Sequence, residues 1–136
     1  MSFALSTTVD LDFDRTVAAL REALAAQGFG ILTEVDLSGT LKAKLDVDVP
    51  RQLLLGACNP SFAHRALQVE EHVGLLLPCS LTVTAVADGT TRVEAMEPQA
   101  MVQLTGNAAL QPVADEVRDR LAAVLTVLPT TAGRTV

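Results

Sequence analysis

Two alternating segments joined by Asp88-Gly89 constrain the fold of this chain more than any other feature. Residues 80–87 and 90–96 alternate apolar and polar side chains, as strands with one buried face do. An Asp-Gly pair between such segments favours a two-residue hairpin turn, because glycine readily adopts the positive φ that this turn needs. The sequence therefore predicts an antiparallel pair of strands, around which the rest of the fold has to be built.

Three further segments have the pattern of strands. Residues 3–9 alternate, residues 30–35 contain several β-branched residues, and residues 51–58 follow directly on a proline. The last segment contains three consecutive leucines, so it is apolar on both faces and we place it in the interior of the sheet. Together with the hairpin, these segments predict five strands.

Two long helices are predicted at the start and the end of the chain. Asp12 is a good N-cap for a helix with apolar residues at three- and four-residue steps, and Gly28 is suited to end it. A wide apolar stripe between Leu110 and Leu128 predicts a closing helix, with Pro112 in its first turn. Both helices have one apolar side that needs a surface to cover it.

Two shorter helices are predicted between the strands. Residues 60–69 have a clean apolar side, and Asn59 and Pro60 are typical of an N-cap and a first helical position. Leucines at 37, 41 and 45 fit a short helix, although Gly39 disfavours it by roughly 1 kcal/mol relative to alanine. We expect the helix over 60–69 to end at Val69, which leaves Glu70 outside it.

The order of these elements predicts an α+β fold. The simplest packing is a five-stranded antiparallel sheet with the helices on one face. The free face is then solvated or paired, which makes a homodimer plausible. With no repeat and no linker, we expect a single domain over residues 1–129 and a flexible tail over residues 130–136.

Composition excludes several classes of partner. The net charge is −6 and no basic run is present, so binding to nucleic acid or to an anionic membrane is disfavoured. The most apolar stretch is far shorter than the roughly 20 residues of a membrane helix, and the N-terminus has no signal-peptide pattern. We therefore expect a cytoplasmic protein whose cysteines are reduced.

Cys58 is the first candidate for chemistry. It ends a predicted strand and directly precedes a helix N-cap, where unpaired N–H groups can lower the pKa of a thiol. Such a thiol would be a better nucleophile or metal ligand. The alternative is that Cys58 is a small buried apolar residue, as cysteines commonly are.

Cys79 opens the next strand, so the topology decides whether it can join Cys58. If the two strands are antiparallel neighbours, both cysteines lie at the same end of the sheet. A parallel crossover would instead separate them by roughly 20 Å, at about 3.3 Å per residue. The pair lacks the spacing of a common metal motif, so packing in the core remains an alternative for Cys79 as well.

His64 and His72 are candidate bases for a cysteine nucleophile, with Glu71 as the residue that orients the imidazole. On the helical wheel, however, His64 lies on the polar side of residues 60–69, which is typical of a solvated side chain. The sequence therefore leaves open whether the protein is an enzyme.

The segments Leu55-Gly56-Ala57-Cys58-Asn59-Pro60 and Gly74-Leu75-Leu76-Leu77-Pro78-Cys79 together resemble a bacterial and archaeal family called domain of unknown function 302. The resemblance extends over about residues 3 to 128. It implies a β-α-β4-α type fold with a curved antiparallel sheet, a homodimer, and a site around Cys58, Asn59, Pro60, Pro78 and Cys79. It implies no activity.

Three functions remain open at this stage. The first is a binding module that holds a small ligand or a soft metal ion, copper(I) or zinc, near Cys58 and Cys79. The second is a thiol enzyme or redox protein in which Cys79 resolves an oxidised Cys58. The third is a structural or regulatory homodimer whose cysteines are inert core residues.

Overall fold

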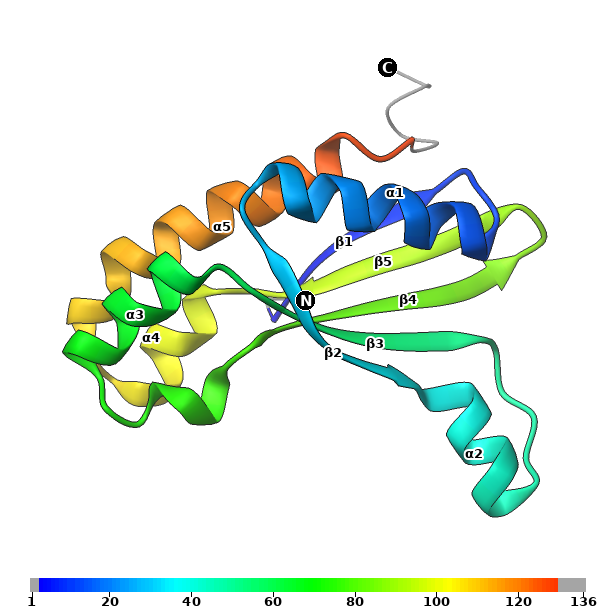
Figure 1. The fold of residues 1–136 in the computed structure, drawn as a ribbon, viewed down its shortest axis with the longest axis horizontal. Helices are drawn as coiled ribbons and strands as arrows, with labels where there is room; N and C mark the ends of the chain where they lie inside the picture. Colours follow the sequence, from blue (N-terminus) through cyan, green and yellow to red (C-terminus); the bar gives the residue numbers. More distant parts are fainter. Residues whose placement is uncertain (1–2, 130–136) are drawn as a thin grey trace.

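The computed structural model describes residues 3–129. These residues form a five-stranded antiparallel sheet with helices on one face, as predicted (Figure 1). The strand order is β1-β5-β4-β3-β2, so the hairpin β4–β5 is central and β1 and β2 form the edges. The strands span Ala4–Val9 (β1), Gly30–Asp36 (β2), Gln52–Cys58 (β3), Cys79–Ala87 (β4) and Thr90–Met96 (β5). The predicted tail over 130–136 lies outside the described residues.

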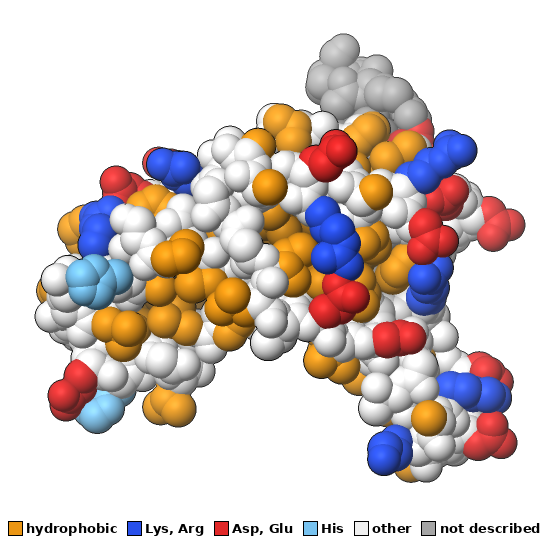
Figure 2. Space-filling view, viewed as in Figure 1, with side chains coloured by type: hydrophobic (Ala, Val, Ile, Leu, Met, Phe, Trp, Pro, Cys, Tyr) orange, Lys and Arg blue, Asp and Glu red, His pale blue; other side chains and the backbone are white. Residues whose placement is uncertain are grey.

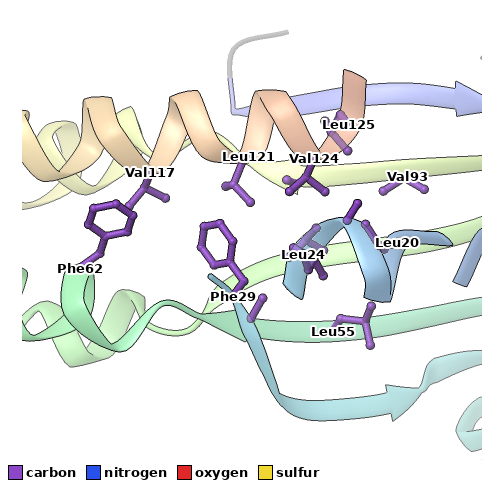
Figure 3. Packing of buried hydrophobic residues seen from close by; sticks show 14 of the residues in the cluster. Leu20, Leu24, Phe29, Leu55, Phe62, Val93, Val117, Leu121, Val124 and Leu125 are labelled. Carbon is purple, nitrogen blue, oxygen red and sulfur yellow. The ribbon is translucent and has the colours of Figure 1, made fainter. Parts of the chain in front are cut away.

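Helices α1 (Phe13–Ala26) and α5 (Gln111–Thr126) cover the sheet. The side chain of Asp12 accepts a hydrogen bond from the backbone N–H of Arg15 at 2.9 Å and caps α1, and Gly28 follows the helix with a φ of +84°. Figure 3 shows side chains of the two helices meeting above the strands, among them Leu20, Leu24 and Leu121, all of which are fully buried. This layer of side chains is the core of the domain.

The predicted short helix exists as α2 (Leu37–Leu45), but it projects from the body instead of lying on the sheet (Figure 1). It has no buried residue. The side chain of Asp36 caps it by accepting a hydrogen bond from the backbone N–H of Gly39 at 2.9 Å. Helix α2 and the loop after it, residues 37–49, are called the arm below.

Helix α3 (Pro60–Val69) ends where predicted, and Glu70 lies outside it, with its carboxylate accepting hydrogen bonds from Asn107 and from the backbone N–H of His72. Helical spacing puts Leu67 and Val69 with Phe62 and Ala66 on the apolar side predicted for residues 60–69, but these two residues are 46% and 43% exposed.

Three short helices were not predicted: η1 (Val73–Leu76), α4 (Gln99–Thr105) and η2 (Ala108–Leu110). Helix α4 fills the space after Pro98, which the sequence indicated only as the end of the hairpin. With α3 and η1 it forms one end of the molecule, called the lobe below.

Candidate site at the cysteine end of the sheet

The register of β3 and β4 brings the two cysteines to the same end of the sheet. The strands are antiparallel, and Ala57 lies directly opposite Cys79. Cys58 is the next residue along β3, so its backbone adjoins this pair at the end of the sheet. This pairing decides between the two topologies left open by the sequence, and the parallel crossover is excluded.

The turn from β3 into α3 fixes the position of Cys58. The side chain of Asn59 accepts a hydrogen bond from the backbone N–H of Phe62 at 3.5 Å, and Pro60 occupies the first turn of the helix. Asn59 is therefore the N-cap that the sequence predicted. Its side-chain oxygen is engaged in this cap, and its side-chain nitrogen lies against Gly28, where a Cβ atom would be 2.8 Å away.

Cys58 and Cys79 line the same pocket, between the sheet, α3, α4 and α5. Its empty volume is about 330 Å³, including the part open to solvent, and the narrow interior leaves room for about one water-sized group. The remaining lining is almost wholly apolar and comprises Phe29, Ala57, Asn59, Phe62, Ala63, Ala66, Leu77, Met101, Val113 and Val117. No charged side chain belongs to this lining.

Met101 is a site residue that the sequence analysis missed. It lies on α4, is 6% exposed, and lines the same pocket as the two cysteines. It also lines an adjoining hollow together with Cys79 and Met96. The sequence feature that could have indicated Met101 is the small number of sulfur-containing residues. The chain has two cysteines and three methionines, and three of these five residues line one pocket.

The environment of Cys79 holds its thiol in the protonated form. Burial, and to a smaller extent the charge of nearby Cys58, raise the pKa of Cys79 to about 11. At neutral pH, Cys79 is therefore a thiol and a poor nucleophile. It becomes a thiolate only when something replaces its proton, as a metal ion does.

The two prolines of the predicted site shape the sheet end without lining the pocket. Pro60 is exposed on the first turn of α3. Pro78, which follows a cis peptide bond from Leu77, packs over Gly56. A Cβ atom on Gly56 would lie 2.5 Å from Cγ of Pro78 and 2.2 Å from Oγ1 of Thr33, so only glycine fits between them.

The candidate bases lie away from the cysteines. His64 is exposed, and the imidazole of His72 forms a surface ion pair with Glu71 at 3.2 Å, with side chains that are 75% and 83% exposed. None of the three residues lines the cysteine pocket. In residues 3–129, no group of three or more His, Cys, Asp or Glu side chains is placed to hold a metal ion.

Comparison with known proteins identifies the family. The sequence matches the domain of unknown function DUF302 over residues 5–128. This chain belongs to the DUF302 family. The crystal structure of an uncharacterized conserved protein, DUF302, from Bacillus stearothermophilus is similar to it, with a TM-score of 0.85 and 31% sequence identity over 93% of this chain and 98% of the other. No curated protein matches this DUF302 chain.

The family and the fold are thus established, and neither specifies a reaction. In the described part of this DUF302 chain, no helix is both long and apolar enough to cross a membrane.

Proposed function

We propose that this DUF302 domain is a binding module that holds a soft monovalent metal ion, copper(I), in the cysteine pocket. The observation that supports it most is the set of residues around the pocket: Cys58, Cys79 and Met101 line one narrow apolar space without any charged side chain. Thiolate and thioether sulfur are the ligands that select copper(I) over harder cations. The room for one small group suits an ion better than a large organic ligand.

Zinc, the other metal considered, fits this set of residues less well. Structural zinc sites are commonly tetrahedral and take four Cys, His or carboxylate ligands. The described residues offer two cysteines at the pocket and no group of three or more such ligands. Copper(I) can be bound by fewer and softer ligands. The lack of a third and fourth ligand of the kind that zinc needs therefore does not exclude copper(I).

The thiol-enzyme alternative is supported less by this geometry. A cysteine nucleophile needs a nearby base or a lowered pKa. The pKa of Cys79 is raised to about 11, and both histidines lie outside the pocket lining. A small apolar ligand remains the second reading of the same pocket, since its walls are mainly alanine, valine and phenylalanine.

The test is an anaerobic competition titration of the reduced protein with copper(I) and a chromogenic copper(I) chelator. Wild type is expected to withdraw one equivalent of copper from the chelator. Cys58→Ser and Cys79→Ser should each weaken binding by about a hundredfold or more, because each removes a thiolate ligand from the ion. Met101→Leu should weaken it by roughly tenfold, because a thioether is a weaker ligand than a thiolate.

Met96→Leu is the matched control for Met101→Leu. Met96 lines the adjoining hollow with Cys79 but not the cysteine pocket itself, so this variant distinguishes the pocket from its surroundings. This substitution should leave copper(I) affinity unchanged. Copper retention by the Cys58→Ser/Cys79→Ser double variant, or no retention by wild type, would refute the proposal. In the second case, binding of a small apolar fluorescent probe that Phe62→Ala abolishes would favour the apolar ligand.

The proposal also predicts the direction of the pH dependence. Metal must displace the proton of Cys79, whose pKa of about 11 lies above the working range. Apparent copper(I) affinity should therefore rise by about tenfold per pH unit for this thiol between pH 6 and 9.

We further propose a cytoplasmic location, where the thiols stay reduced, and a homodimer that associates through the open edge of the sheet.

A further inference from the structure

The two edges of the sheet differ in how they are covered. β1 is one edge, and α5 lies along it, with the chain after α5 tied back by a hydrogen bond from the N–H of Asp10 to the carbonyl of Pro129 at 2.8 Å. β2 is the other edge, and six of its seven residues are exposed. Leu32 and Val35 of β2 are 66% and 45% exposed. An open edge with apolar side chains is a template for pairing with another strand.

Exposed apolar side chains lie on the arm and on the lobe, the two segments on either side of β2 in Figure 1; Figure 2 shows those of the lobe as a group. The arm contributes Leu45, Val47 and Val49, which are 66%, 40% and 42% exposed. The lobe contributes exposed Leu67, Val69, Leu75 and Leu104. Exposed apolar side chains that gather on one side of a molecule commonly mark interaction sites. In Figure 2 the outline of the molecule is indented between the arm and the lobe.

We propose that two copies of the chain associate through antiparallel pairing of their β2 strands, with the arm of each copy packed on the lobe of the other. The topology dictates this exchange. β2 begins at Gly30, which pairs with Cys58 just before α3 of the lobe, and it ends at Asp36, just before the arm. Two-fold antiparallel pairing reverses these ends, so the partner's arm arrives beside this chain's lobe.

Charge complements the apolar contact. Within the arm, Lys42 forms ion pairs with Asp46 and Asp48, whereas Lys44 makes no ion pair with any described residue and is left to meet a partner. The segment that joins α3 to η1 presents Glu71, whose carboxylate is 83% exposed beside His72 and can meet a second positive charge. Opposite charges at the rim of an apolar contact favour the correct register over others. A second copy thus supplies both the apolar and the charged complement, which is why we choose it as the partner.

The open face of the sheet is a poorer candidate for the same role. Its side chains include Ser6, Thr8 and Thr82, and Arg92 forms an ion pair with Glu94 at 3.1 Å across it. This is the composition of a solvated face of an antiparallel sheet. The inference does not depend on the copper(I) site and can fail or succeed without it.

The test begins with sedimentation equilibrium of the full chain, for which we expect a concentration-dependent dimer. Val35→Arg should raise the dimer dissociation constant by roughly tenfold or more, because it places a charge in the β2 pairing. Val86→Arg is the matched control: Val86 is 43% exposed, against 45% for Val35, but lies beside the hairpin turn. A monomeric wild type, or equal effects of the two substitutions, would overturn the proposal.

A charge exchange tests the contact between arm and lobe. Lys44→Glu should weaken the dimer by a few-fold because it places like charges together, and Glu71→Lys should do the same. The double variant Lys44→Glu/Glu71→Lys should recover the affinity of wild type. If the double variant is as weak as the sum of the single variants, the arm does not meet the lobe and the exchange is wrong.

Discussion

Helices α5 and α2 are both predicted by apolar residues at helical spacing, and both form, but different interactions hold them. α5 buries Val113, Ala114, Val117, Leu121, Val124 and Leu125 against the rest of the domain. α2 buries nothing. Apolar spacing therefore indicates a helix with an apolar side, while the surface that covers this side has to come from tertiary or quaternary structure.

The interactions that hold α2 are mainly local. Asp36 caps its first turn, Lys42 forms an ion pair with Asp46 at 2.9 Å four residues on, and Asp46 ends the helix in the left-handed conformation with a φ of 54°. Each such interaction is worth a fraction of the free energy that a buried leucine provides. Beyond them, the backbone N–H of Gln52 in β3 donates a hydrogen bond to Oγ of Ser38 at 3.1 Å. A nine-residue helix held mainly by local contacts is marginal in water, which agrees with the covering surface proposed above.

The largest effect that tests this comparison is the loss of a leucine from each helix. Leu121 is fully buried and Leu45 is 66% exposed. Leu121→Ala should lower the free energy of unfolding by about 2–5 kcal/mol, because it leaves a cavity in the core. Leu45→Ala, measured in dilute protein by urea denaturation, should change it by less than about 0.5 kcal/mol.

Equal losses from the two substitutions would contradict the comparison, because the arm would then be part of the cooperative core. If the dimer forms as proposed, Leu45→Ala should become more destabilising as the protein concentration rises, whereas the effect of Leu121→Ala should stay constant.

Sequence patterns predicted the sheet and its main helices because local signals and burial agreed there. The Asp88-Gly89 turn, the capping residues Asp12 and Asn59, and the apolar stripe of α5 all have the roles that their residue types favour. Helix α4 was missed because it has seven residues and no capping side chain, and its position depends on packing by Ala100 and Met101. Met101 could therefore not be assigned to the pocket before the fold was known.

Gly39 shows a different limit of sequence patterns. Because glycine has a low helix propensity, Gly39 disfavours the helix predicted over residues 37–45. In the structure, a Cβ atom at this position would lie 2.4 Å from the carboxylate of Asp36. Glycine therefore leaves room for the carboxylate of Asp36 to cap the helix. The residue that disfavours the helix by its propensity also makes its N-terminal cap possible.

The next largest effect concerns a half-buried group of the body, the thiol of Cys79 at the pocket, in contrast with the exposed groups of the arm. Its pKa is raised from 9.0 to about 11 in the folded state, so the unfolded chain loses this proton first as pH rises. Stability should be fully present below pH 9 and fall by about 2 kcal/mol between pH 9 and 11, allowing for partial exposure. Alkaline urea denaturation of wild type and Cys79→Ala measures this.

Cys79→Ala should lack this loss of stability between pH 9 and 11. The chain contains no tyrosine, and the exposed arm holds both of its lysines, so few other groups titrate in this range. An unchanged slope in the variant would show that the thiol is not desolvated as its position in the pocket requires.

The smallest effects should come from the two N-caps, one on the body and one on the arm. Asn59→Ala removes the cap of α3, which packs Phe62 and Ala66 into the core, and should cost about 1 kcal/mol of global stability. Asp36→Ala should leave the urea midpoint unchanged and instead speed amide hydrogen exchange within α2 alone, because the arm opens without the core.

Asp36 also makes the stability of the arm dependent on pH. The N–H of Gly39 and the hydroxyl of Ser38 lower the pKa of Asp36 below its ordinary value of 3.8, so the cap is complete above this pH and is lost as the carboxylate is protonated below it. Amide signals of α2 should report fraying in this acid range while those of α5 stay unchanged. Asp36→Asn keeps a capping oxygen without a titrating group, so its arm should show no such transition. A transition that α2 and α5 share in wild type would mean that the arm unfolds only together with the core. The two helices would then differ in how much surface they bury, but they would unfold in one cooperative step.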